Sequence, residues 1–534
     1  MKAKYISYQD THSFSKLVLD YVNDDQFLKS FYSFRPDLDG LKKAADARNF
    51  QGNRAELVEV LTAQYQNVKT NKSVKHNIAL LSDPNTLTIT TGHQLNLFTG
   101  PLYFIYKIVT AINLALELKI AYPEKNFVPV YWMATEDHDF EEINHVNVDE
   151  KNISWIQQTN GATGRLSTTT VAAAVLAYKG YLGISKNGKK LGKLVENAYL
   201  HNNNLADATR VLVNGLFEHY GLVIINADDP KLKKQFSSII EQDILHQHSA
   251  HLTEKTSESL IKNGYKTQVS GREINFFYLL ENLRERMLEK DKRYFVNHTE
   301  ISFSKEELIA EINNYPERFS PNVIMRPLYQ EVILPNIAYI GGGAEVSYWL
   351  QLKANFDHYA VDFPVLLLRN SALLIDKRSA ENLAKLGFKL EDVFLPTAEL
   401  QTAWITKNSG ANLSLIDQIK TIQAVFDQIK QNALVVDKTL ERSADSAKTK
   451  TSHLLANLEK KFIRAEKRKH QVALKQIENV KNRLFPTGVL QERVLNIAPM
   501  YVNYGEDFLS SLIENFQPLG GDFTLLLPSQ KSKA

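Results

Sequence analysis

Short apolar runs followed by dense polar segments dominate the pattern of hydrophobic and polar positions near the start of the chain. The runs LTITT (residues 87–91) and FVPVY (residues 127–131) are typical of buried strands, and residues 105–118 between them have helical periodicity. Strand, glycine-rich turn, helix and strand make a β-α-β unit. Because ligands of parallel sheets bind beyond the carboxyl ends of the strands, we expect both polar segments to share one cleft.

The alternation of helix and strand patterns continues to about residue 370. A helix pattern at 206–220 precedes a buried strand pattern with an acidic end at 221–230, and a β-hairpin pattern covers 273–296. Further strand patterns lie at 322–327, 337–345 and 365–370.

These patterns together predict an α/β fold. Its core, residues 86–410, is expected to be a doubly wound, Rossmann-like parallel sheet interrupted by insertions near 151–205 and 231–320. Clusters of Gly, Thr and Ser within residues 151–200 indicate that the first insertion is irregular. The mixed, polar residues 1–85 predict an N-terminal helical segment.

A long helical arm is predicted beyond the core. Residues 411–485 contain neither glycine nor proline, and apolar or small residues recur there in alternating steps of three and four. This spacing predicts an all-α coiled coil. A turn at the small, polar residues 443–448 would make it an antiparallel hairpin, and a straight rod is the alternative. The last segment, 486–534, carries apolar runs and is expected to pack back on the core.

The length and amino-acid composition of the chain exclude several classes of protein. A chain of 534 residues is too long for one core, so we expect several structural units. The chain has no cysteine, which excludes disulfides, a thiolate nucleophile and cysteine-ligated metals. It opens without the apolar region of a secretory signal, and no apolar stretch approaches the roughly eighteen residues of a membrane span. We therefore expect a cytoplasmic protein with no membrane contact.

Positive charge is concentrated in the predicted arm. The whole chain has a net charge of +3, whereas residues 448–483 contain 11 Lys or Arg and 3 Asp or Glu. A nucleic-acid-binding helix is one interpretation, but stacking on bases needs aromatic side chains and this stretch has only Phe462. A solvated coiled-coil face explains the charge more simply, so we expect no nucleic-acid partner. A scaffolding dimer with a non-catalytic cleft is a further alternative.

The first polar segment, residues 91–103, combines two glycines with hydrogen-bond donors at the expected start of a helix. Free N–H groups and the helix dipole make such a start a site for an anion such as phosphate. A tight turn that merely buries its histidine is the alternative. The candidate residues of this turn are Gly92, His93, Gln94, Thr99, Gly100 and Lys107.

The second polar segment is strongly acidic. Glu136, Asp137 and Asp139 surround His138 and precede two more glutamates, and these carboxylates repel one another unless a cation offsets them. A metal, a substrate amine or the protein's own Arg and Lys are the three options, and a solvated loop with helix-capping acids is the alternative. No zinc-ligand spacing is present, so we expect no dedicated metal site, while Mg²⁺ accompanying a nucleotide stays open.

A third region repeats the strand-turn-helix arrangement around a triple glycine. Arg326 is a candidate partner for a substrate carboxylate, and Glu345 for an amine. Arg369 and Ser371 follow another strand pattern and are candidates for phosphate or carboxylate contacts. Walker, dinucleotide-binding and nucleophile-elbow motifs are absent from the sequence. The candidate residues of this region are Arg326, Gly341, Gly342, Gly343, Glu345, Tyr348, Arg369 and Ser371.

These blocks resemble the BshC family, the cysteine-adding enzymes of bacillithiol biosynthesis. The matching text is TGHQLNLFTGPLYFIYK, VPVYWMATEDHDFEEINHV, SPNVIMRP with AYIGGGAEVSYW, and FPTGVLQERVLN. The resemblance runs from about residue 85 to the end of the chain. It implies a Rossmann-like core related to class I aminoacyl-tRNA synthetases, with connecting-peptide insertions and a coiled-coil arm that forms a homodimer.

The resemblance also implies an activity: cysteine is added to glucosaminyl-malate through an amide bond in the last step of bacillithiol biosynthesis. On that analogy His93 and its glycines bind a nucleotide, and residues 136–139 recognise the amino acid. A carboxylate needs a leaving group before an amine attacks it, so ATP is expected as a substrate, with no tightly bound cofactor. Asp137 or Asp139 would hold the cysteine ammonium, and His138 or Glu136 would accept the proton of the attacking amine. Adenylation and phosphorylation both remain open.

Overall fold

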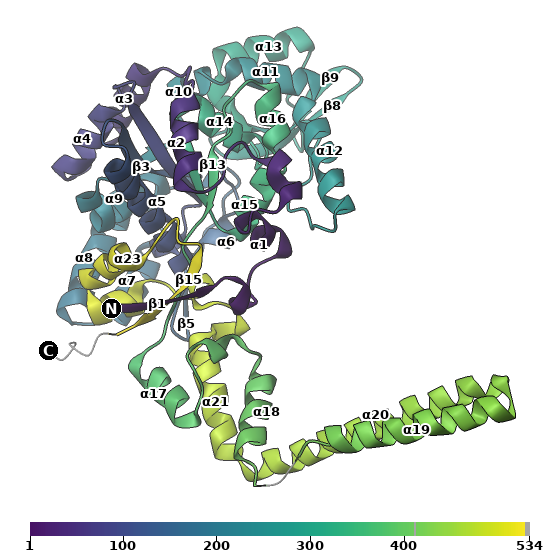
Figure 1. The fold of residues 1–534 in the computed structure, drawn as a ribbon. Coiled ribbons are helices and arrows are strands. Elements are labelled where there is room, and N and C mark those ends of the chain that lie inside the picture. The colour runs from purple at the N-terminus through teal and green to yellow at the C-terminus, as the bar shows by residue number, and fades with distance from the viewer. Residues whose placement is uncertain (411–412, 529–534) are drawn as a thin grey trace. The chain divides into compact units, whose positions relative to one another are not determined.

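In the computed structural model, which describes residues 1–410 and 413–528, the centre of the fold is a parallel sheet with the strand order β13–β12–β2–β3–β6 (Figure 1). Neighbouring strands pair in parallel, with Leu87 opposite Phe127 and Thr90 opposite Tyr339. This confirms the predicted α/β fold. The strands are β2 (Thr86–His93), β3 (Asn126–Met133), β6 (Val223–Asn226), β12 (Asn336–Gly341) and β13 (Val365–Leu368).

The chain divides into two units. Unit 1 comprises Met1–Leu373 and Leu490–Ala534, and unit 2 comprises Leu374–Val489. Residues 411–412, which begin the predicted coiled-coil segment, and 529–534, which end the predicted C-terminal segment, lie outside the described residues.

Helix α5 (Leu102–Ala121) connects β2 to β3 and completes the predicted β-α-β unit. Its residues Leu114 and Leu118 pack with Ile89 of β2 and Ile340 of β12 in one buried cluster. The helix is buried on most sides because it lies between the sheet and α23 (Glu506–Asn515). Within the described part of the chain no helix, α5 included, is both long and apolar enough to cross a membrane.

Other predicted elements are confirmed as well. Helix α9 (Leu205–Phe217) precedes β6, and β7 (Phe276–Leu280) pairs with β8 (Leu283–Lys290) in an antiparallel hairpin. The hairpin belongs to a second sheet with the order β10–β9–β8–β7–β11. The remaining strands of this sheet are β9 (Arg293–Val296), β10 (Ser302–Phe303) and β11 (Phe319–Pro321).

The strand predicted at 322–327 is wrong, because helix α14 (Met325–Ile333) begins there. The Asn322 side chain accepts hydrogen bonds from the backbone N–H groups of Ile324 and Met325, which starts the helix. Pro327 lies in the first turn, where its missing N–H breaks no helical bond. The short apolar run at residues 323–325 fits a buried strand or a buried helix equally, and tertiary packing decided the outcome.

The irregular structure predicted for residues 151–200 is wrong over its second half. Helices α7 (Ala172–Leu182) and α8 (Lys186–Leu200) occupy this region. Ser185 caps α8 by accepting a hydrogen bond from the N–H of Gly188. Buried residues at helical spacing, among them Leu191 and Val195, then hold α8 on the fold.

The N-terminal segment contains the predicted helices and, unexpectedly, a strand. Strand β1 (Lys2–Ser7) pairs antiparallel with β15 (Asp522–Leu527), so residues from both ends of the sequence lie side by side in unit 1 (Figure 1). The helices of the segment are α1 (Lys16–Val22), α2 (Leu38–Ala47), α3 (Arg54–Gln64) and α4 (Lys72–Leu80).

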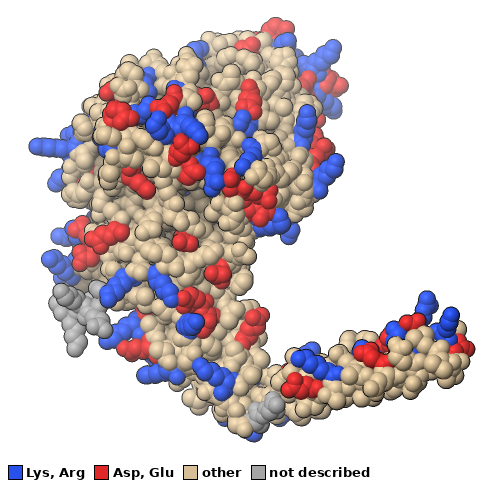
Figure 2. Space-filling model, in the orientation of Figure 1, with Lys and Arg blue, Asp and Glu red and all other residues tan. Residues whose placement is uncertain are grey.

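Unit 2 contains an antiparallel helical hairpin, which decides between the hairpin and the rod. Helices α19 (Ile416–Val436) and α20 (Glu441–Lys469) run alongside each other, with Lys430 Nζ 2.9 Å from Asp445 Oδ2. The turn lies at Lys438–Leu440, not at the predicted 443–448, because Asp437 is extended and its side chain accepts from the N–H of Thr439. Lys, Arg, Asp and Glu are interspersed along the hairpin in Figure 2, as expected of a solvated face. Helices α17 (Lys377–Leu386), α18 (Thr397–Asn408) and α21 (Gln471–Leu484) complete unit 2.

The buried side chain of Asn496 makes several hydrogen bonds to the loop between β2 and α5. Phe98, Thr99 and Gly100 all have positive φ, at 48°, 75° and 60°. Asn496 donates to the carbonyl oxygens of Phe98 and Gly100 at 2.8 and 2.7 Å, and its own oxygen accepts from the Tyr178 hydroxyl at 2.7 Å. The conformation of this loop therefore depends on a residue almost four hundred positions later, since Asn496 and Phe98 are 398 apart.

We expect Asn496→Leu to destabilise unit 1 by about 3 kcal/mol, because it leaves two carbonyls and a hydroxyl buried without partners. The exposed Asn197→Leu, on α8, is the matched control and should stay within about 0.5 kcal/mol of wild type. Urea denaturation followed by tryptophan fluorescence measures both. Equal effects of the two substitutions would contradict the role assigned to Asn496.

Candidate functional site

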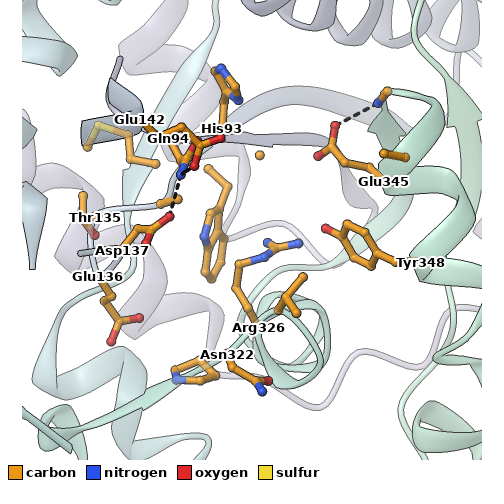
Figure 3. A pocket seen from close by; sticks show the side chains of 18 of the residues that line it. His93, Gln94, Thr135, Glu136, Asp137, Glu142, Asn322, Arg326, Glu345 and Tyr348 are labelled. Carbon is orange, nitrogen blue, oxygen red and sulfur yellow. Dashed lines mark hydrogen bonds between the residues drawn. The ribbon is translucent and has the colours of Figure 1, made fainter. Parts of the chain in front are cut away.

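A cavity of about 760 Å³ lies at the carboxyl ends of β2, β3 and β12, within unit 1. Its walls come from these strands, from α5, α14 and α15 (Gly343–Leu350), and from the β7–β8 hairpin of the second sheet. In Figure 3 Glu136, Asp137 and Glu142 lie on the wall opposite Glu345 and Tyr348. The polar segments thus share one cleft, as the β-α-β pattern predicted.

Most of the predicted site residues line this cavity, and six do not. The lining residues are Gly92, His93, Gln94, Lys107, Glu136, Asp137, Arg326, Gly342, Gly343, Glu345, Tyr348 and Arg369. The residues outside the lining are Thr99, Gly100, His138, Asp139, Gly341 and Ser371.

The residues outside the lining support those within it. The Asp139 carboxylate caps the short helix α6 (Phe140–Ile143) by accepting from the N–H of Glu142. The Ser371 hydroxyl accepts from Arg369 Nη1 at 2.9 Å. The His138 side chain does not line the cavity, and its Nδ1 lies 2.7 Å from Nη1 of Arg284. Thr99 and Gly100 belong to the loop that Asn496 holds.

The start of α5 is not the free anion site that the sequence predicted. The backbone N–H of Leu102, the first residue of the helix, donates to the carbonyl oxygen of Leu495 at 2.8 Å. Lys107, the predicted source of positive charge, donates to the Gly92 carbonyl at 2.9 Å and pairs with the Glu345 carboxylate. An anion at this helix start would therefore find neither the N–H of Leu102 nor an unpaired Lys107.

His93 stands at the end of β2 with an unpartnered nitrogen. Its ring stacks on Phe104, with centroids 5.3 Å apart, and meets the edge of Tyr103 at 5.2 Å. Burial, and then the charges of Lys107 and Arg369, lower the pKa of His93 well below its usual value. The ring is therefore neutral at pH 7, and its buried Nε2 has no hydrogen-bond partner among the described residues.

The protein's own cations offset the acidic segment. Glu136 forms an ion pair with Lys233, a fully buried lysine that also donates to the Phe319 carbonyl at 2.9 Å. Asp137 accepts from Gln94 Nε2 at 2.7 Å and from the N–H of His138 at 2.7 Å. Among the described residues, no group of three or more His, Asp or Glu is arranged to hold a metal.

The pKa values of the adjacent carboxyl groups of Glu136 and Asp137 are shifted in opposite directions. Burial raises the pKa of Glu136, although the charge of Lys233 opposes this. Burial would also raise the pKa of Asp137, but hydrogen bonds from His138 and Gln94 and the charge of Arg284 lower it overall. Asp137 is thus firmly anionic, while Glu136 takes up a proton more readily than an ordinary glutamate.

Glu345 is committed to the structure of the turn rather than free for an amine. Its Oε1 accepts from the Tyr339 hydroxyl at 2.7 Å, and its Oε2 accepts from the N–H of Gly342 at 2.8 Å, which caps α15. With Lys107 as a third donor, the carboxylate has little capacity left for a ligand.

Arginines make the cavity cationic. Among the described residues, no hydrogen-bond partner is found for the buried Nη2 of Arg326 or the buried Nε of Arg369. Nη2 of Arg369 pairs with Glu492 at 2.6 Å. Among the lining residues seven are Lys or Arg and four are Asp or Glu, which favours an anionic ligand. The cationic lining residues are Lys107, Arg272, Arg284, Arg286, Arg326, Arg369 and Arg493.

Sequence reasoning missed several of these residues. Arg272, Arg284 and Arg286 come from the second insertion, and nothing local to them signals a site. Lys233 was detectable in principle, because a lysine shortly after the acidic end of strand β6 is a natural partner for other carboxylates at the same edge of the sheet.

We expect Lys233→Met to destabilise unit 1 by about 3–5 kcal/mol, because it leaves the buried Glu136 carboxylate without its partner. Adding Glu136→Gln should restore most of that loss. Lys231→Met is the control on the same helix: Lys231 pairs with Glu59 at 2.6 Å where both side chains are more than half exposed, so little change is expected. Thermal denaturation at pH 7 measures all variants, and a double variant no more stable than Lys233→Met would refute the pairing.

We also expect His93 to make unit 1 sensitive to acid. The ring is neutral when folded and takes up a proton on unfolding below its ordinary pKa of 6.5, so stability is full above that pH and falls below it. Between pH 7 and pH 5 wild type should lose about 2 kcal/mol more than His93→Gln. Urea denaturation at both pH values measures this, and identical losses would show that the ring is already protonated in the folded protein.

Comparison with known proteins agrees with the resemblance seen in the sequence. The family described as "Bacillithiol biosynthesis BshC, N-terminal Rossmann-like domain" matches residues 1–370, and "Bacillithiol biosynthesis BshC, C-terminal coiled-coil domain" matches residues 372–527.

Relatives of similar length carry one name, "Putative cysteine ligase BshC". The protein of Flavobacterium psychrophilum is 45% identical over 98% of this chain and 99% of its own. The protein of Flavobacterium johnsoniae is 45% identical over 98% of this chain and 100% of its own. The protein of Bacillus cytotoxicus is 28% identical over 92% of this chain and 94% of its own. A solved structure titled as a putative arginyl-tRNA synthetase from Campylobacter jejuni covers 83% of this chain and 100% of its own at 12% identity, but its TM-score of 0.21 carries no argument.

Proposed function

Because the chain belongs to the bacillithiol biosynthesis BshC family, we propose that it is an ATP-dependent cysteine ligase that forms an amide bond with glucosaminyl-malate. One observation carries the proposal: the cavity at the carboxyl edge of the sheet contains the anionic Asp137 and Arg326, whose Nη2 has no hydrogen-bond partner among the described residues. An amine and an anion can therefore bind there together.

Activation of cysteine is the first requirement. Its carboxylate is unreactive toward amines until an oxygen becomes a leaving group, which ATP provides. The phosphates need positive charge, both to bind and to stabilise the charge that develops on transfer. Arg326 and Arg369 supply it within the cavity, and the exposed Arg272, Arg286 and Arg493 supply it at the mouth. His93 and Gly92 lie beside this set, in the position proposed for the nucleotide.

The placement of side chains narrows the acid and base assignments. Asp139 and His138 do not line the cavity, so Asp137 is left to hold the cysteine ammonium and Glu136 to accept the proton of the attacking amine. The opposite pKa shifts of these two groups suit the two roles, since one must stay charged and the other must take up a proton. Mg²⁺ would enter only with the nucleotide, where Glu142, which shares Gln94 with Asp137, is the carboxylate still available.

The helical hairpin is proposed to join two copies of the chain. Apolar side chains remain exposed along it, among them Val425 at 48%, Ile429 at 45% and Leu454 at 68%. A second copy of the same hairpin would cover them. We further propose that the enzyme is cytoplasmic.

The test mixes purified protein, cysteine, glucosaminyl-malate and ATP, and detects the amide product by mass spectrometry. AMP as co-product would indicate adenylation and ADP would indicate an acyl phosphate. We expect Asp137→Asn to lower kcat/KM for cysteine about hundredfold, the loss of a charge-assisted contact. Glu141→Gln, a neighbouring exposed side chain outside the cavity, is the control and should retain activity.

Failure of the wild-type protein to form product from these substrates would refute the proposed reaction. Full activity of Asp137→Asn would remove that residue from ammonium recognition. Thermal-shift titration with ATP, which stabilises only a protein that binds it, separates a ligase from a scaffold with an inert cleft.

A further inference from the structure

A buried polar chain leads from the cavity into the N-terminal segment. Arg326 Nη1 donates to Oε1 of Gln330, one turn further along α14, at 3.0 Å. Gln330 Nε2 then donates to Oε1 of Glu331 at 2.9 Å. Gln330 is 0% exposed and Glu331 is 1% exposed, so water does not compete for either contact.

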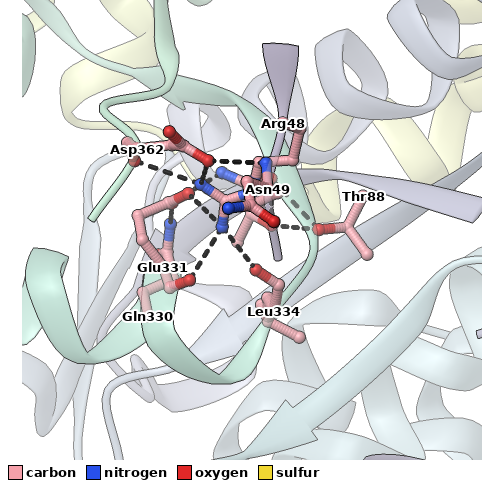
Figure 4. A network of polar contacts seen from close by, with 9 residues as sticks. Arg48, Asn49, Thr88, Gln330, Glu331, Leu334 and Asp362 are labelled. Carbon is pink, nitrogen blue, oxygen red and sulfur yellow. Dashed lines mark hydrogen bonds and ion pairs between the residues drawn. The ribbon is translucent and has the colours of Figure 1, made fainter. Parts of the chain in front are cut away.

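The Glu331 carboxylate is held in turn by residues from other elements. Its Oε1 also accepts from Asn336 Nδ2 at 2.7 Å. Its Oε2 lies 3.4 Å from Arg48 Nη2 (Figure 4). Asn336 begins β12, and its oxygen accepts from the Thr90 hydroxyl of β2 at 2.8 Å. Glu331 is thus fixed against the same strands whose ends form the cleft.

Arg48 closes the chain at the end of α2. Its Nη2 donates to the carbonyl oxygens of Glu331 and Leu334 at 2.7 and 2.9 Å, and its Nη1 donates to that of Asp362 at 3.1 Å (Figure 4). The side chain is 4% exposed. Arg48 does not line the cavity, and both of its terminal nitrogens are engaged, so its role is to hold Glu331 and the backbone around it.

We infer that Gln330 and Glu331 are positioning residues for Arg326: they fix one edge of its guanidinium so that the opposite edge meets an anionic group of the ligand. The inference rests on the proposed function for the identity of that group, a nucleotide phosphate or an acceptor carboxylate. The positioning role itself rests on the hydrogen bonds among Arg326, Gln330 and Glu331.

The order of charges along the chain gives the amide a single orientation. Gln330 has its oxygen toward the cationic Arg326 and its N–H toward the anionic Glu331, and the reverse orientation would place like dipoles against both. The guanidinium also lies among aromatic rings, with its carbon 5.8 Å from the centre of Trp132 and 5.7 Å from that of Tyr339. Nη2, which has no hydrogen-bond partner among the described residues, is the edge left for the ligand, on a guanidinium that also interacts with the Tyr348 side chain.

Arg48 favours the charged form of the Glu331 carboxyl group. Burial raises its pKa to about 7, while Arg48 and the hydrogen bonds from Gln330 and Asn336 act against that rise. The charged groups near it are Arg48, Asp362 on the far side of Arg48, and Arg326 beyond Gln330. The N-terminal segment therefore contributes to the cleft through charge, without lining it.

The first test compares crystal structures of wild type and Gln330→Met. We expect the guanidinium of Arg326 to leave its position once the acceptor is lost. An unchanged guanidinium would overturn the inference. Glu331→Gln retains an oxygen for Gln330 and should keep Arg326 in place, whereas Glu331→Leu should not.

The second test is a double-mutant cycle on ligand binding, with ATP and malate as separate probes in calorimetry. Gln330→Met should raise the Kd of one probe about tenfold, and should add nothing in the Arg326→Met background. An effect on ATP alone identifies a phosphate as the partner of Arg326, and an effect on malate alone identifies a carboxylate. Independent, additive effects of the two substitutions, or no effect of Arg326→Met on either probe, would overturn the inference.

Gln351→Met is the matched control. Gln351 is a buried glutamine with four hydrogen bonds of its own, and it does not contact Arg326. The Gln351→Met variant should lower the melting temperature as Gln330→Met does, and it should leave the Kd values of ATP and malate unchanged. Because binding is measured without turnover, coupled binding with no amide product would refute the proposed reaction alone, and amide product with additive binding would refute the positioning role alone.

Discussion

The cleft depends on burying opposite charges in pairs. An unpartnered charge at a buried sheet edge costs several kcal/mol, and three cations there are offset by carboxylates from other parts of the fold. The pairs are Lys107–Glu345, Lys233–Glu136 and Arg369–Glu492. Each joins segments far apart in the sequence, so the pairs form only when the sheet, the insertion and the C-terminal segment are in place. Beside these pairs the buried Arg326 guanidinium keeps an edge without a hydrogen-bond partner among the described residues, and this edge is a focus of positive charge.

Much of the fold could be predicted from the sequence because its signals are local. Apolar runs separated by the periodic α5 specify a β-α-β unit, and a parallel sheet then brings the strand ends together without further information. His93 and Asp137 could be assigned to one cleft for that reason alone. Their neighbours could not: Asp137 lines the cavity while His138 and Asp139 do not, because the turn after β3 directs successive side chains differently.

The rest depended on contacts that no local pattern encodes. The run at 322–327 suits a strand or a helix, and the capping side chain of Asn322 together with the buried face of α14 made it a helix. Arg284 reaches the cleft only because the second sheet packs there. The turn of the helical hairpin lies at Asp437 rather than among the small residues of 443–448, since those residues are compatible with helix and Asp437 stabilises a break through its own side chain.

The pairing of β1 with β15 has a consequence for how the protein is made. The ribosome synthesises β1 first and β15 only after the whole helical arm. Unit 1 therefore lacks the partner strand of β1 during most of translation. Arg369 likewise lacks its ion-pair partner until Glu492, 123 residues later in the chain, has been synthesised. Throughout that interval the nascent chain exposes an incomplete edge and an uncompensated charge to chaperones and proteases. A message cut short within the arm would therefore yield a chain for degradation rather than a partly active enzyme.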